Sequence, residues 1–187
     1  MKKFLISILI SFVFLQIPAF AETDWNELYF QSQPFESKLM NNIDPFQDED
    51  TIKYAYTPYP LFRTSCHLYY KNIKIDPGYY QLTPRKMNGK YYLFFKTCGR
   101  VKFIIPIVKR ELVPAAFYKK YTPDPRLTLG QTIARNWKRF WSRIFKSSGK
   151  QPPPPCFVEM DDVEAFYILK LYFKDHCYFT VYKKVPY

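Results

Sequence analysis

The dipeptide Asn88-Gly89 places the strongest constraint on the fold of this chain. It separates two runs with strand character, Tyr79 to Thr83 and Lys90 to Thr97. Both central residues of a type I′ turn need positive φ, which Asn and Gly adopt readily, so the sequence predicts a tight β-hairpin here. A two-residue turn would set Leu82 opposite Phe95 and Tyr79 opposite Cys98.

The second strand of this hairpin is apolar on both faces. Tyr91 to Phe95 is an unbroken apolar run rather than an alternating one, which is typical of a central strand covered on both sides. The next run, Val101 to Val108, contains Pro106. Because proline cannot donate to a sheet ladder, we expect that strand to lie at an edge or to carry a bulge.

Composition and a second hairpin extend this pattern to the whole domain. Aromatic residues make up 20% of the chain, and there are 16 prolines but only 5 glycines. This composition favours strands with irregular connections over a helical bundle. Residues 164–173 and 177–183 predict another hairpin across residues 174–176. The expected fold is mainly β, an antiparallel β-sandwich or open barrel built from hairpins, with one inserted basic amphipathic helix.

The N-terminus has the pattern of a cleavable secretory signal. Met1-Lys2-Lys3 is followed by an apolar run from Phe4 to Leu15 and by Ala19-Phe20-Ala21. Small residues two apart suit signal peptidase, so residues 1–21 are predicted to be a signal peptide. The alternative, an uncleaved anchor, needs about 20 apolar residues. We therefore expect an exported protein, periplasmic or secreted.

Charge divides the mature chain into three parts. Residues 22–50 carry eight acidic residues and one lysine, a net charge of −7. Residues 51–150 carry 21 bases and three acids, a net charge of +18, and residues 151–187 are nearly neutral. We interpret 22–50 as an acidic, weakly ordered arm and 51–187 as a single β-rich domain with a Pro-rich linker at 151–155. A basic field of this kind attracts anions, and the arm is hypothesised to fold onto the basic body.

The inserted helix is expected at about residues 128–147. Thr128 and Gln131 match a capping box, and Ser147 begins a stretch that ends the helix. At about 100° per residue the large apolar side chains share one arc and the cations share the opposite one. The apolar arc holds Leu129, Ile133, Trp137, Phe140, Trp141 and Ile144, and the basic arc holds Arg135, Lys138, Arg139, Arg143 and Lys146.

This helix offers two interpretations. An acid-free basic face opposite an aromatic face suits an anionic membrane interface, where Trp is favoured. The anion- or membrane-binding residues would then be Arg135, Trp137, Lys138, Arg139, Trp141, Arg143 and Lys146. Alternatively, the apolar arc packs on the sheet and the basic arc faces water, because period alone does not separate the two cases.

Four cysteines, Cys66, Cys98, Cys156 and Cys177, remain in the mature chain. An even number in an exported protein predicts two disulfides, and three pairings are possible. We favour Cys66–Cys98 and Cys156–Cys177, since each bridge would close one half of the domain. No C-x-x-C pair is present, which disfavours a zinc site.

Catalytic and cofactor signals are weak. His67 and His176 each adjoin a cysteine, and Asp161, Asp162 and Glu164 form a small acidic cluster. Surface histidines and a solvated strand are the simpler interpretations of these features. The chain has no Gly-rich phosphate loop, no G-x-S-x-G and no H-E-x-x-H motif. No cofactor and no metal site is predicted.

The sequence favours a non-catalytic envelope or secreted protein that binds an anionic partner through a basic aromatic surface. The expected partner is an anionic membrane surface, an acidic polymer such as a glycan, or an acidic protein, and export disfavours nucleic acid. One alternative is a hydrolase-like envelope enzyme with a site near His67 or His176. Another is a structural or secretion-apparatus subunit.

Overall fold

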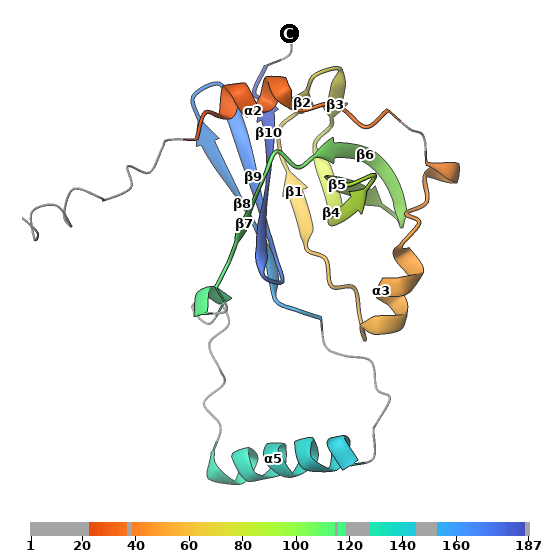
Figure 1. Cartoon of the computed structure of the whole chain (residues 1–187), viewed down its shortest axis with the longest axis vertical. Coiled ribbons are helices and arrows are strands. Elements are labelled where there is room, and N and C mark those ends of the chain that lie inside the picture. The colour runs from red at the N-terminus through yellow and green to blue at the C-terminus, as the bar shows by residue number, and fades with distance from the viewer. Residues whose placement is uncertain (1–22, 37–38, 115, 119–127, 145–152, 186–187) are drawn as a thin grey trace, which may run out of the picture.

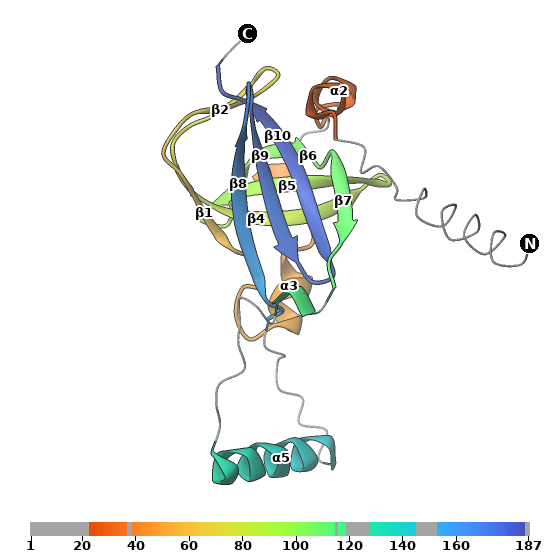
Figure 2. The ribbon, with the colours of Figure 1, turned by 90° about the vertical axis from the view of Figure 1, so that its left-hand side faces the viewer.

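The computed structural model describes residues 23–36, 39–114, 116–118, 128–144 and 153–185. The predicted signal peptide lies outside these residues. The protein is mainly β, and two antiparallel sheets pack face to face in a sandwich-like arrangement (Figure 1), as the sequence predicted. Figure 2 shows the strands of one sheet crossing steeply over those of the other. Packing of this kind buries the facing sides of both sheets in one core.

The first sheet is built around the predicted hairpin. Its four strands are ordered β1-β4-β5-β6 and span Leu61–Thr64, Gly78–Met87, Lys90–Thr97 and Arg100–Pro106. Asn88 and Gly89 both have positive φ, and Leu82 pairs with Phe95, so the predicted turn and register are confirmed. The β4–β5 ladder ends at Gln81–Lys96, so the expected pairing of Tyr79 with Cys98 does not form. Cys98 lies in the next turn, where its φ is positive.

Two further predictions for this sheet are confirmed. β5 is a central strand, with Leu93 and Phe95 in the main core and Phe94 in a second cluster on its other face. β6, which ends at Pro106, is one of the two edge strands of this sheet, and the β5–β6 register shifts between Phe95 and Lys96. Pro106 therefore lies where a missing N–H removes no second ladder.

The second sheet contains the C-terminal hairpin. β8, β9 and β10 span Cys156–Val163, Phe166–Phe173 and His176–Lys183, and β9 pairs with both of the others. The free side of β10 is shared by two short strands, because its start pairs with β7 (Lys109–Leu112) and its end with β2 (Leu68–Tyr70). β3 (Ile73–Ile75) completes the sheet beside β2.

The described residues of the acidic segment contain short helices. It forms α2 (Trp25–Gln31), the short 3-10 helix η1 (Met40–Asn42) and α3 (Gln47–Lys53). Asp24 caps α2 by accepting hydrogen bonds from two backbone N–H groups, both at 3.0 Å. Tyr29 is fully buried in the main core, where it packs against Tyr70 and Phe166. The buried aromatic ring explains the order, since it fixes a segment whose polar sequence shows no clear period.

Candidate functional site

The inserted helix forms as predicted and spans α5 (Leu129–Ile144). Its first turn is held by the expected capping box. The backbone N–H of Thr128 donates to Gln131 Oε1 at 3.0 Å, and the N–H of Gln131 donates to Thr128 Oγ1 at 3.4 Å. Two N–H groups that a helix start leaves without partners are thereby satisfied.

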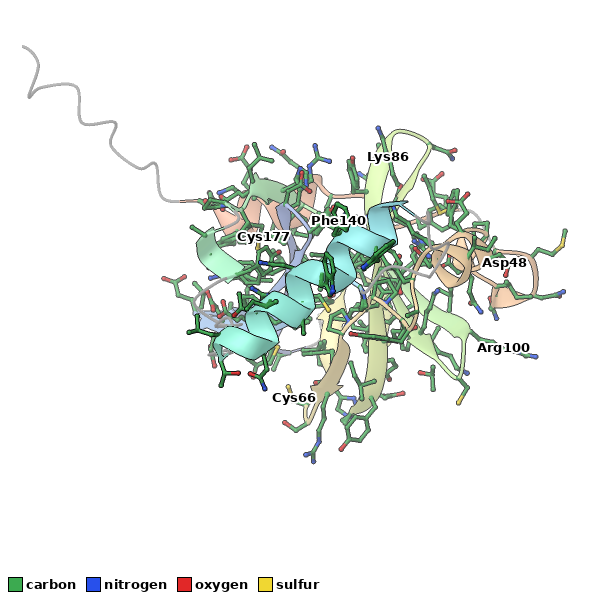
Figure 3. The ribbon with its side chains drawn as sticks, turned by 90° about the horizontal axis from the view of Figure 1, so that it is seen from below. Asp48, Cys66, Lys86, Arg100, Phe140 and Cys177 are labelled. Carbon is green, nitrogen blue, oxygen red and sulfur yellow. The ribbon has the colours of Figure 1, made fainter. Side chains whose placement is uncertain are left out.

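The apolar arc of α5 faces solvent. The exposed fractions are 85% for Leu129, 67% for Ile133, 60% for Trp137, 51% for Phe140 and 42% for Trp141. Figures 1 and 2 show α5 apart from both sheets, and Figure 3 shows it, with Phe140, crossing in front of the sandwich when viewed from below. In this structure the apolar arc does not pack on the sheet. Packing on the sheet was one of the two interpretations that the sequence left open.

Three rings on α5 contact one another and make its apolar face continuous. The centroid of Trp137 lies 6.0 Å from that of Phe140 and 5.9 Å from that of Trp141, and the Phe140 and Trp141 centroids are 5.8 Å apart. We call these three residues, with Leu129 and Ile133, the aromatic face of α5. Exposed apolar patches of this kind mark surfaces that are covered by a partner or a membrane.

The basic face of α5 is described only in part. Arg135 is exposed. Helical periodicity puts Lys138, Arg139 and Arg143 on the same arc, although their side chains lie outside the described ones, as does Lys146. Residues 128–144 contain no aspartate or glutamate. The five predicted cationic positions therefore have no acidic neighbour on the helix.

A buried ion network, which the sequence analysis missed, joins the acidic segment to the first sheet. Asp44 is buried beside Arg85 of β4 and Lys96 of β5 and contacts both cations. Asp50 of α3 also pairs with Arg85, and the Tyr59 hydroxyl donates to Asp50 at 2.7 Å while it accepts from Arg85 Nη1 at 2.7 Å. These contacts agree with the hypothesis that the acidic segment folds onto the basic body.

The network shifts the protonation of its members in predictable directions. Burial alone would raise the pKa of Asp44, but hydrogen bonds from Arg85 and Lys96 outweigh it and hold the pKa below the ordinary value. Burial lowers the pKa of Lys96 despite its contact with Asp44. Two of the 21 bases of residues 51–150 thus serve the fold and are not available to a partner.

The predicted disulfides are not formed, because all four cysteines are free thiols in the structure. Cys156 is paired with Phe173 and Cys177 with Tyr172, so β9 lies between the two cysteines. Adjacent residues of β9 point to opposite faces, and two strand spacings amount to about 9.6 Å. That separation exceeds the roughly 7 Å between Cα atoms that a disulfide can bridge.

The second favoured pair, Cys66 and Cys98, is separated by a strand in the same way. Cys66 follows β1, Cys98 lies exposed in the turn between β5 and β6, and β4 runs between β1 and β5. The prediction of two bridges rested on an even count in an exported chain. It failed because sequence spacing carries no information about which face of a sheet a cysteine occupies.

The two histidines do not converge on a catalytic arrangement. His67 Nδ1 lies 3.2 Å from Asp76 Oδ1, and His176 Nδ1 lies 2.7 Å from Asp175 Oδ1. Neither histidine lines any of five cavities in the described part of the chain. None of these five cavities therefore joins a histidine to a carboxylate, as the hydrolase alternative would require.

The acidic cluster of β8 is used in ion pairs. Asp161 pairs with Lys170 of β9, Asp162 pairs with Lys184, and Glu164 follows in a turn with positive φ. No group of three or more His, Cys, Asp or Glu side chains that could hold a metal ion occurs among the described residues.

Among the helices that the structure describes, none combines the length and the apolar character that a membrane span requires. Comparisons with protein-family models, with curated proteins and with solved structures give no match to this chain.

Proposed function

We propose that this protein is an exported, non-catalytic protein that docks on an anionic lipid surface through α5. The observation that carries the proposal is the aromatic face of α5, where five large apolar side chains of one helix are exposed side by side. A helix held by its own capping box, with apolar side chains that are 42% to 85% exposed on one face, has the form of a surface-docking element.

The chemistry of α5 favours a lipid interface over a purely polar anion. An interfacial helix buries its apolar face about 5–10 Å into the boundary between headgroups and acyl chains. Trp137 and Trp141 suit that depth, because an indole ring is apolar while its N–H remains hydrated. Each cation close to an anionic bilayer contributes about 1 kcal/mol. An acidic glycan would meet the cations but would leave the aromatic face in water.

The second part of the proposal concerns the compartment in which the protein acts. The N-terminal pattern of Lys2-Lys3, an apolar run and Ala19-Phe20-Ala21 supports export. An exported protein of net charge +10 after cleavage, since Lys2 and Lys3 are lost from +12, would meet anionic lipid at the envelope.

Co-sedimentation of the mature protein with vesicles tests the proposal. We expect binding to vesicles of phosphatidylglycerol and phosphatidylcholine and little binding to phosphatidylcholine alone. The Arg135→Gln/Lys138→Gln variant should bind the anionic vesicles roughly 30-fold less, from about 1 kcal/mol per cation. Arg100→Gln/Lys102→Gln is the matched control, because it removes two exposed cations from β6, and Figure 3 shows Arg100 pointing away from the body.

Aromatic variants separate docking from simple attraction of charge. Trp137→Ala/Trp141→Ala leaves the net charge unchanged. It should also weaken binding at least tenfold, because two large aromatic rings are lost from the contact with the lipid. Tyr56→Ala/Tyr79→Ala, which removes two exposed rings from the sandwich, should not. Equal binding to neutral and anionic vesicles, or equal losses in both aromatic pairs, would overturn the proposal. Binding to an acidic polymer with no vesicle binding would replace the lipid by that polymer.

A further inference from the structure

A groove lies where the chain crosses from the first sheet to the second. The backbone N–H of Ile107 donates to Tyr91 O and the N–H of Val108 donates to Phe179 O, both at 2.9 Å, so the crossing segment is held by one strand of each sheet. The C-terminal end of α2 forms the facing wall. Together they enclose a cavity of about 340 Å³, which is within the size range of small-molecule sites.

The lining of this groove is cationic and free of carboxylates. Lys90, Lys109 and Arg110 line it together with Tyr91, Tyr92 and Gln31, and no aspartate or glutamate contributes. Four other cavities in the described part of the chain each have at least one carboxylate in their lining. We call this site the basic groove.

Two of its cations have no carboxylate of their own. Lys109 pairs with Glu111 at 2.7 Å, whereas Lys90 and Arg110 form no ion pair among the described residues. The guanidinium of Arg110 lies 4.4 Å from the centroid of the Tyr91 ring, and Lys86 Nζ lies 5.6 Å from it. Stacking on Tyr91 orients the planar guanidinium while its N–H edge remains available to an acceptor.

We infer that the basic groove binds the phosphoryl group of a small ligand whose uncharged part lies against the partly exposed Tyr91 and Ile107. A guanidinium presents two parallel donors to a phosphate, and an ammonium supplies a second charge from another direction. Tyr91 and Ile107 give the remainder of the ligand an apolar surface. A carboxylate-free lining removes the repulsion that the other cavities would impose on an anion.

The position of the groove argues that its ligand is separate from the surface that meets α5. In Figures 1 and 2, α2, which walls the groove, lies at one end of the molecule and α5 at the other. One flat surface would not reach both sites. A soluble phosphorylated compound, or a phosphate headgroup in a second surface, has the required chemistry. The inference is independent of the proposed function of α5.

Titration with a hexose 6-phosphate, followed by calorimetry at low salt, tests the inference. We expect saturable binding of the sugar phosphate and no binding of the unphosphorylated hexose. Lys90→Gln/Arg110→Gln should lose at least tenfold in affinity, the usual size for loss of charged hydrogen-bond donors. Arg100→Gln/Lys102→Gln, with the same change in net charge, should retain the wild-type affinity. Circular dichroism and thermal unfolding establish that both variants are folded.

Two further arms separate the sources of the phosphate and the two sites. Phosphatidylglycerol vesicles are given to Arg135→Gln/Lys138→Gln, in which α5 is impaired. If this variant still binds vesicles, and adding Lys90→Gln/Arg110→Gln abolishes that binding, the ligand of the groove is a lipid headgroup. If only the sugar phosphate binds, the ligand is a soluble compound. Absence of binding by both probes, or equal loss of sugar-phosphate affinity in the β6 control, overturns the inference. Vesicle binding through α5 can survive that result, so the two proposals fail separately.

Discussion

Arg85 and Asp44, 41 residues apart in sequence, form a two-point ion pair in the interior of the protein. Arg85 Nε lies 3.0 Å from both carboxylate oxygens, and Nη2 donates to Oδ2 at 2.7 Å. Forked contacts of this kind combine charge with fixed geometry. The pair attaches the acidic N-terminal segment to β4 and makes that segment part of the sandwich.

Replacing Asp44 by asparagine should strongly destabilise the fold. The change leaves Arg85 and Lys96 buried with one carboxylate fewer, and breaking a buried pair in this way costs about 3–5 kcal/mol. Urea denaturation measures the free energy of unfolding. Asp48→Asn, at an exposed position on α3 that Figure 3 labels, is the control and should change it by about 0.5 kcal/mol or less. Similar losses in the two variants would mean that the pair contributes little.

The same carboxylate should make stability depend on acidity. Because the pKa of Asp44 is lower in the folded protein than its ordinary value of 3.8, the folded state binds fewer protons than the unfolded state. The stabilisation is therefore full above about pH 5 and is lost as the pH falls through the lowered folded pKa. The free energy of unfolding should fall on acidification from about pH 5 to pH 2, and less steeply in Asp44→Asn. An unchanged slope in that variant would assign the acid sensitivity to other groups.

Local rules predicted the hairpin core of the fold well. Asn88-Gly89 specified both the turn and the pairing of Leu82 with Phe95, and the two-faced apolar run specified that β5 is central. The same register places Arg85 and Lys96 on one face of the sheet, beside Tyr92 and Phe94. Buried cations beside aromatic rings require carboxylate partners. The ion network could therefore have been predicted from the sequence, but only by combining the β4–β5 register with the charges on both strands.

Other features depend on contacts between distant segments. The order of the N-terminal segment rests on Tyr29, which is buried against rings from β2 and β9. No local sequence periodicity predicts such a contact. The disulfide prediction failed for a related reason, since the face that Cys156 or Cys177 occupies depends on the pairing of three strands. For α5, periodicity predicted the helix and both arcs, but the exposure of its apolar arc required the structure.

Thiol labelling should distinguish the four cysteines of the native protein. Cys98 is exposed in a turn, whereas burial raises the pKa of the Cys177 thiol to about 12 and keeps it protonated at neutral pH. Because the thiolate is the reactive form, a maleimide should label Cys98 first and Cys177 only after unfolding. Mass spectrometry of unreduced protein, labelled after denaturation, should count four thiols. A count of zero would establish two bridges and a different pairing of strands.

Removing α5 should leave the sandwich intact. Its aromatic face is exposed, and its capping bonds join Thr128 only to residues of the same helix. A variant in which a short Gly-Ser linker replaces residues 128–146 should therefore lose helical signal in circular dichroism. Its free energy of unfolding should change by about 1 kcal/mol or less, because the helix buries little apolar area against the sheets.

Gly130→Ala is a useful companion, since no atom outside the helix lies within 4 Å of the added methyl group. It should strengthen the helix by about 0.5–1 kcal/mol without altering the unfolding of the body. A loss of several kcal/mol on removal of α5 would mean that the aromatic face packs on the sandwich in solution, and the lipid-docking proposal would then lose its support.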